Sequence, residues 1–113
     1  MKLLTAELRQ QLPPLYAQEH ASDPIVYAKF FMPSSNWTWY VTEGSAQCDP
    51  DNPAGGEIDF LFFGLVIGFE KELGYFSLAE LESARGPMGL AIERDLHFTL
   101  GPLSEVLKRD GQC

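Results

Sequence analysis

Segments rich in aromatic and β-branched residues alternate along this sequence with short turns, and they dictate what the chain can fold into. Two of them, Ile25 to Phe31 and Trp37 to Thr42, are separated by a short polar loop. In the second, large apolar residues alternate with mostly smaller polar ones, which puts Trp37, Trp39 and Val41 on one face of a strand. Two strands so close in sequence predict an antiparallel hairpin.

Further strands follow in the second half of the chain. Asp59 to Phe69 is apolar on both faces, which is typical of a central strand, and a charged turn leads to a return strand at Leu73 to Phe76. One more strand is expected around Leu96 to Phe98. Gly44 to Glu57 is rich in Asp, Pro, Gly and Asn, so it predicts a long, exposed and mobile loop.

Short helices are expected beside these strands. Ser77 and Glu80 form a capping box, which predicts a helix that stops before Gly86. Other helical turns are predicted from Thr5 to about Gln11, over Leu15 to His20, and from Pro102 to about Arg109. The predicted fold class is α+β, an antiparallel sheet of about four or five strands with short flanking helices, in a single domain over residues 1–113.

The charge of the chain is strongly unbalanced. Sixteen acidic and eight basic residues give a formal net charge of −8. This charge repels phosphate backbones and anionic lipids, so neither direct nucleic-acid binding nor membrane binding is expected. It attracts basic surfaces of other proteins, and the alternative is that it only keeps the surface solvated. A protein partner is predicted, and an edge strand rich in Phe and Tyr could also pair with a second copy of the chain.

The cysteines and the lengths of the apolar segments indicate the cellular compartment of the protein. Cys48 and Cys113 are far apart and form no CxxC pair, so neither a zinc site nor a disulfide framework is expected. Phe60 to Phe69 is too short to cross a bilayer, and the first residues lack the apolar run of a signal peptide. A cytoplasmic protein without a cofactor is the expectation.

Carboxylates at the ends of predicted strands are the candidate catalytic groups. Glu43 ends one strand and Asp59 begins the next, so antiparallel pairing could bring them together. Such a pair can bind Mg²⁺ or divide acid and base roles in hydrolysis, with Glu93 or Asp95 as further candidates. The alternative is that these carboxylates cap loops or pair with arginine. Neither histidine has a neighbour that would suggest a nucleophilic triad.

The candidate binding residues are mostly aromatic. Trp and Tyr are favoured anchors in protein contacts, and Arg can hold a carboxylate or phosphate with two hydrogen bonds. Core packing and a local ion pair with the neighbouring carboxylates are the alternatives for these side chains. The candidates are Trp37, Trp39, Tyr40, Tyr75 and Arg94.

Four phrases together resemble a known bacterial family. They are Trp37 to Glu43, Asp59 to Gly64, Gly74 to Leu81, and Ile92 to Asp95. The chain resembles the DUF2958 family, of unknown function, over nearly its whole length. The resemblance implies a small single-domain protein, often encoded on plasmids and integrative elements, with a role in the biology of transferred DNA. It supplies no catalytic residues.

Two functional hypotheses follow. The first is a small acidic accessory protein, a non-enzymatic module that binds a protein partner. It accounts for the size, the charge and the lack of a catalytic motif. The second is a metal-dependent hydrolase or nuclease that uses Glu43 and Asp59. It accounts only for the carboxylates at strand ends.

Overall fold

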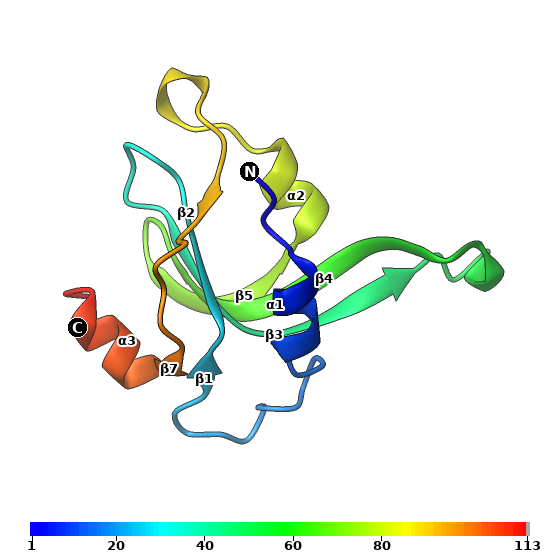
Figure 1. Ribbon diagram of the computed structural model, residues 1–113, viewed down its shortest axis with the longest axis horizontal. Coiled ribbons are helices and arrows are strands. Elements are labelled where there is room, and N and C mark those ends of the chain that lie inside the picture. Colours follow the sequence, from blue (N-terminus) through cyan, green and yellow to red (C-terminus); the bar gives the residue numbers. More distant parts are fainter. Residues whose placement is uncertain (113) are drawn as a thin grey trace.

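The main element of the fold is a five-stranded antiparallel sheet with the strand order β5-β4-β3-β2-β6. A computed structural model describes residues 1–112 of the chain. The two central strands, β3 and β4, are each 11 residues long, and their hairpin continues beyond the rest of the sheet (Figure 1). The strands are β2 (Ala28–Phe31), β3 (Thr38–Cys48), β4 (Glu57–Ile67), β5 (Lys71–Ser77) and β6 (Glu93–Arg94).

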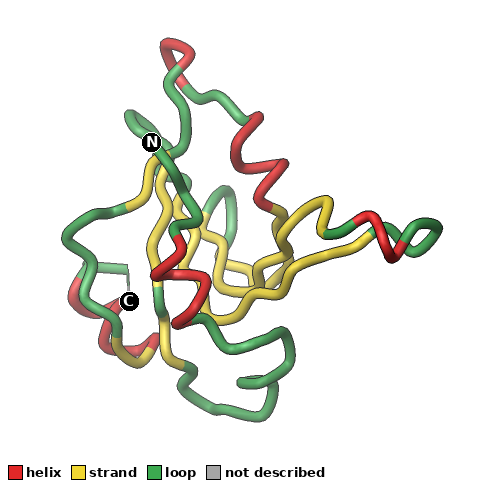
Figure 2. Tube along the Cα trace, turned by 45° about the vertical axis from the view of Figure 1, so that its right-hand side comes forward, coloured by secondary structure: helices red, strands yellow, loops and turns green. Residues whose placement is uncertain are grey.

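Short elements surround the sheet. A small second sheet pairs β1 (Ile25–Val26) with β7 (Gly101–Pro102). Figure 2 shows the helices as short pieces around the strands, with one at the tip of the protruding β3–β4 hairpin. The helices are α1 (Ala6–Gln11), α2 (Leu78–Ser83), α3 (Leu103–Arg109) and the 3-10 turns η1 (Pro53–Gly55) and η2 (Pro87–Gly89). The fold class is α+β, as predicted.

The sheet has an apolar core on each of its two faces. The first, here called the α1–α2 face, buries Phe30 and Phe62 beneath Leu8 of α1 and Leu81 of α2. On the opposite face, here called the α3 face, a smaller core of buried residues packs against α3. Its members are Val26, Tyr40, Leu65, Ile67 and Val106. Because both faces are covered, the central strands are apolar on both sides, as their sequence predicts.

Several local predictions are confirmed. The hairpin of β2 and β3 forms, and β4 and β5 follow as central and return strands. Thr5 Oγ1 accepts a hydrogen bond from Leu8 N, which caps α1. Ser77 Oγ accepts one from Glu80 N, which caps α2. The terminal helix starts directly after Pro102 and ends at Arg109.

Other predictions are wrong, and in each case a contact distant in sequence decides. The expected strand from Ile25 to Phe31 divides at Tyr27, because β1 pairs with β7 whereas β2 pairs with β3. The expected loop from Gly44 to Glu57 begins as strand, since β3 extends to Cys48 by pairing with β4, which starts at Glu57. Only residues 49–56 lie between the two strands.

Two further segments differ from expectation. Leu96 to Phe98 forms a turn, not a strand, because the Asp95 carboxylate accepts a hydrogen bond from His97 N. His97, in the middle of this turn, is exposed. Leu15 to His20 forms successive turns in place of a helix, with hydrogen bonds from Ala17 N to Pro14 O and from Glu19 N to Tyr16 O.

A β-bulge at Thr42 determines which residues of β3 lie on which face. The pair Val41 and Gly64 is followed directly by the pair Glu43 and Phe63, so Thr42 is the additional residue. Thr42 Oγ1 donates a hydrogen bond to Phe63 O at 3.1 Å. Beyond the bulge, Glu43 lies on the α3 face and Gly44 lies on the α1–α2 face, where it contacts Phe60.

Two glycines that face each other across β4 and β5 have opposite surroundings. A Cβ atom at Gly64 would lie 1.8 Å from Tyr40 O, whereas a Cβ atom at Gly74 would have no atom within 4 Å. We therefore expect Gly64→Ala to destabilise the fold by about 1–3 kcal/mol, because the added methyl group overpacks the sheet. Gly74→Ala should be neutral or stabilising by up to about 1 kcal/mol.

Urea unfolding of the two variants checks this expectation, since both change glycine to alanine in adjacent strands. Equal effects of the two substitutions would contradict the close packing of Gly64 against β3.

Candidate functional site

Glu43 and Asp59, the two predicted catalytic carboxylates, are not brought together. Glu43 pairs with Phe63, whereas Asp59 pairs with Gln47. Phe63, the partner of Glu43, and Asp59 are four positions apart along β4. The two carboxylates therefore lie at positions of the sheet separated by roughly 13 Å along the strand direction. A catalytic role for the pair stays a prediction that this register does not favour.

Both carboxylates have structural partners instead. Glu43 is only 3% exposed, and its two oxygens accept hydrogen bonds from Tyr16 N at 2.8 Å and Gln18 N at 2.7 Å. Asp59 Oδ1 accepts hydrogen bonds from Phe60 N and from Ala79 N in the first turn of α2. Glu43 thus ties the segment before β1 to the sheet, and Asp59 ties α2 to β4.

Glu93, Arg94 and Asp95 lie at the opposite edge of the sheet, on and just after β6. The Arg94 side chain contacts Lys2 O through Nε, at 3.5 Å. The local ion pair expected for Arg94 is not among the ion pairs of residues 1–112. Within the same residues, no three His, Cys, Asp or Glu side chains are grouped so that they could hold a metal ion.

Tyr40, a predicted binding residue, is fully buried in the core under α3. Its hydroxyl donates a hydrogen bond to Asp110 Oδ2 at 2.8 Å, and Lys29 Nζ donates to the same oxygen at 2.9 Å. Burial raises the pKa of Tyr40, and the neighbouring Asp110 raises it further. Burial also acts to raise the pKa of Asp110, but the hydrogen bonds from Lys29 and Tyr40 outweigh it and lower that pKa. Tyr40 is therefore structural.

Trp37 and Trp39 line an open groove on the α1–α2 face. Their rings stack with centroids 5.9 Å apart, and Phe69 meets Trp37 edge-on at 5.5 Å. Phe69 is 96% exposed, in the turn between β4 and β5. Two adjoining depressions of about 300 Å³ each share Trp37 and Val66. We call this surface the tryptophan groove. Besides the two shared residues, one depression is lined by Gly68, Phe69, Glu70 and Glu72, and the other by Trp39, Tyr75, Phe76, Glu80, Leu81, Ala84 and Ile92.

The rim of the tryptophan groove is acidic, and one side of it is a sheet edge. Glu70, Glu72 and Glu80 are all exposed. Beside them runs β5, the last strand of the sheet, which pairs only with β4 among the described strands. Gly74 of β5 faces the groove side and leaves open space there. Backbone groups on the outer edge of such a strand can pair with another chain.

Tyr75, the next residue of β5, lies on the α3 face. The residue is 51% exposed, and its ring packs against Phe63 of β4 with centroids 4.9 Å apart. Tyr16 covers it edge-on, with centroids 6.5 Å apart. Phe63, Tyr75 and Tyr16 surround a pocket of about 170 Å³ with Glu19 and Glu43. We call this the tyrosine pocket.

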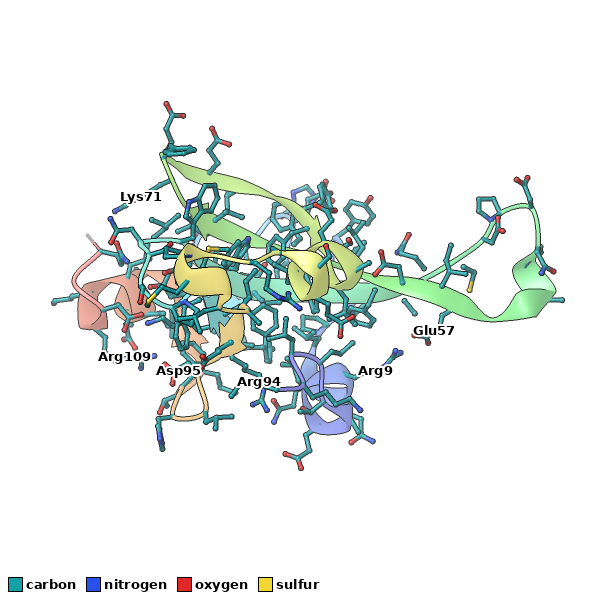
Figure 3. All side chains as sticks on the ribbon, turned by 90° about the horizontal axis from the view of Figure 1, so that it is seen from above. Arg9, Glu57, Lys71, Arg94, Asp95 and Arg109 are labelled. Atoms are coloured by element: carbon teal, nitrogen blue, oxygen red, sulfur yellow. The ribbon has the colours of Figure 1, made fainter. Side chains whose placement is uncertain are left out.

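Most basic side chains of the described chain lie elsewhere. Figure 3 shows Arg9 of α1 beside Glu57, where the β3–β4 hairpin leaves the body of the molecule. This contact lowers the pKa of Glu57. Lys29 is paired with Asp110, and Lys71 donates to Gln112 O. Neither the tryptophan groove nor the tyrosine pocket includes a Lys or Arg among its lining residues.

The prediction from sequence missed most residues of these two surfaces, among them Phe69, Tyr16 and Glu19. Phe69 was expected to end a buried strand, although the charged residues that follow it are a turn signal. Tyr16 and Glu19 belong to a segment expected to be helical. Tyr16 has a φ of 75°, and this conformation depends on the contact with Glu43, so no local signal indicates it.

Comparison with known protein families identifies the family of the chain. Residues 3–110 match the family model described as protein of unknown function (DUF2958). The chain belongs to the DUF2958 family. No curated protein and no solved structure matches this DUF2958 protein.

The helices of this DUF2958 protein are all short. Within residues 1–112, none has the length and the apolar character needed to span a membrane.

Stability of this DUF2958 protein should depend on pH through Asp110. The pKa of Asp110 is lower in the folded protein than its ordinary value of 3.8. Its contribution to stability is therefore present above that value and is lost as the pH falls through the folded pKa. We expect Asp110→Asn to lower the free energy of unfolding at pH 7 by about 1–2 kcal/mol. Urea unfolding at several pH values should show that the difference in stability between wild type and Asp110→Asn shrinks at pH values below 3.8, the ordinary pKa of Asp. A difference that stays constant with pH would contradict this role of Asp110.

Glu43 should be needed to hold the segment that contains Tyr16. Glu43→Gln replaces one acceptor oxygen by an amide that cannot accept from a backbone N–H. We expect a loss of about 1–3 kcal/mol, because a buried donor stays unsatisfied, and faster amide exchange at Tyr16 and Gln18. Glu19→Gln, on an exposed side chain of the same segment, is the matched control. Unchanged exchange at both amides in Glu43→Gln would refute this role.

Proposed function

We propose that this DUF2958 protein is a non-enzymatic module that binds a protein partner through the tryptophan groove and the outer edge of β5. The observation that carries the proposal is the combination of three properties in one place. An aromatic floor and an acidic rim lie beside the edge strand β5, which contributes Glu72, Tyr75 and Phe76 to the groove. This combination suits an extended segment of another protein.

The aromatic floor supplies the binding energy in this proposal. Phe69 is almost fully exposed, and it contacts Trp37, which is itself only partly buried. A partner that covers these rings removes apolar surface from water, and each square ångström contributes about 25 cal/mol before the costs of association. Aromatic residues in such positions are typical anchors of protein interfaces.

The acidic rim selects the partner. Glu70, Glu72 and Glu80 surround the groove, and the whole chain has a net charge of −8. A basic segment is therefore attracted, and an acidic one is repelled. A second copy of the chain would add the same negative charge, which disfavours self-pairing through this edge. The occurrence that the family resemblance implies, on plasmids and integrative elements, leads us to propose a partner from the machinery that transferred DNA meets in its host.

Selection from a library of displayed peptides tests the proposal without knowledge of the natural partner. Wild-type protein is the bait, and the affinity of the selected peptides is then measured by fluorescence anisotropy. We expect extended, basic and apolar peptides that bind about tenfold more weakly to Phe69→Ser, because an exposed aromatic anchor is lost.

Ile58→Ser is the matched control, since Ile58 is an exposed apolar residue outside the groove, 66% exposed near the protruding hairpin. Peptides that bind equally to wild type and Phe69→Ser would contradict the proposal. A selection that yields only peptides sensitive to Ile58→Ser would contradict it as well.

A further inference from the structure

The tyrosine pocket lies on the other side of the same strand edge. Glu43, Phe63 and Tyr75 are direct partners across β3, β4 and β5, so they form one row on the α3 face. Tyr16 and Glu19 come from the segment before β1 and complete the wall. Tyr75 is adjacent in sequence to Gly74, which faces the tryptophan groove. Tyr75 therefore borders both sites, which open on opposite faces of the sheet.

The pocket contains a buried carboxylate without a positive partner. Glu43 is 97% buried, as its 3% exposure shows, and its only hydrogen bonds within residues 1–112 come from backbone amides. None of the ion pairs of the described residues involves it. A buried charge is costly unless it is compensated, and backbone amides compensate only part of it. A cation in the pocket would supply the rest.

The aromatic walls of the pocket favour the same kind of ligand. Tyr16 is 60% exposed and Tyr75 is 51% exposed, so parts of both rings are accessible. The faces of such rings attract ammonium and guanidinium groups. The cation–aromatic contacts of the described chain are Arg9 with Phe60, Lys29 with Tyr40 and Arg109 with Phe98, so none uses these two rings.

Two carboxylates, Glu19 and Glu43, line the pocket. The hydrogen bond with Tyr16 is the largest cause that raises the pKa of Tyr75, followed by burial and then by the charges of Tyr16, Glu43 and Glu19. Glu19 also lines the pocket, and its side chain is 59% exposed; its ion-pair contact among the described residues is with His20, 3.9 Å away, which is positive only when protonated. The buried Glu43 and the exposed Glu19 thus both attract a cation to the pocket.

We infer that the tyrosine pocket binds one lysine or arginine side chain of an extended partner segment that adds to β5. The inference rests on the proposed function for the identity of the partner, and it names the chemistry that the partner must carry. Consecutive side chains of a strand point to opposite faces. A segment paired with β5 therefore directs an apolar residue into the tryptophan groove and the next residue, which is basic, into the tyrosine pocket.

Small cations test the pocket independently of any partner. The probes are N-acetyl-arginine methylamide, N-acetyl-lysine methylamide and the neutral norleucine analogue, titrated into labelled protein and followed by NMR. We expect saturable shifts of the amides of Tyr16 and Tyr75 with the two cations, and none with norleucine. Tyr75→Leu and Glu19→Gln should each weaken binding of the cations, by about tenfold for Tyr75→Leu.

Glu7→Gln is the matched control for Glu19→Gln, because it removes the same charge from an exposed position on α1. Equal shifts with norleucine, shifts that persist in Tyr75→Leu, or no shift up to the solubility limit of the probes would each overturn the inference. A dimer that covers the pocket at β5 in sedimentation equilibrium would overturn it too.

The failure of this inference can be distinguished from failure of the proposed function. Replacing the basic residue of a selected peptide by norleucine should weaken its binding about tenfold if that residue occupies the pocket. Peptides that depend on Phe69 but tolerate this change would overturn the pocket and leave the proposed function standing. If small cations bind the pocket but no selected peptide depends on Phe69, the pocket stands and the proposed function is overturned.

Discussion

The pairing of β3 with β4 is the interaction on which the rest of this structure depends. Ten residue pairs join the two strands, and the bulge at Thr42 sets the face of every residue beyond it. If Thr42 were paired normally, Glu43 would lie on the α1–α2 face, because side chains alternate along a strand. It would then not reach the backbone amides of Tyr16 and Gln18. The bulge is therefore the reason why a carboxylate is buried beneath the tyrosine pocket.

The two surfaces beside β5 have a common physical origin. The sheet is covered by short helices, and these leave the outer part of β4 and β5 open near Gly74 on one face and Tyr75 on the other. Aromatic rings that a larger protein would bury are therefore exposed, and carboxylates surround them. An edge strand flanked by exposed aromatic side chains can cause aggregation unless another chain covers it. The proposed binding of a basic, extended segment gives these exposed features a single explanation.

The elements that could be predicted from sequence are those set by neighbouring residues. The helix caps at Thr5 and Ser77 bond to residues three positions further along the chain. The alternation of apolar and polar residues from Trp37 to Val41 lies within a single strand. The end of β3 at Cys48 could not be predicted in this way, because it is stabilised by pairing with Glu57. The same holds for the tyrosine pocket, since the position of Tyr16 depends on Glu43, 27 residues away. Residue type alone predicts binding roles for Trp37, Trp39 and Tyr75, which line the two surfaces, and it predicts the same for Tyr40, whose ring fills the core.

Hydrogen exchange at the backbone amides of β5 tests the central claim most directly. Alternate amides of an edge strand point away from its partner, so those of β5 should exchange quickly in the free protein. When a selected peptide that depends on Phe69 is bound, the account predicts that these outward amides become protected while those facing β4 change little. Protection confined to other parts of the chain, with the outer amides of β5 still exchanging quickly, would contradict strand addition at this edge.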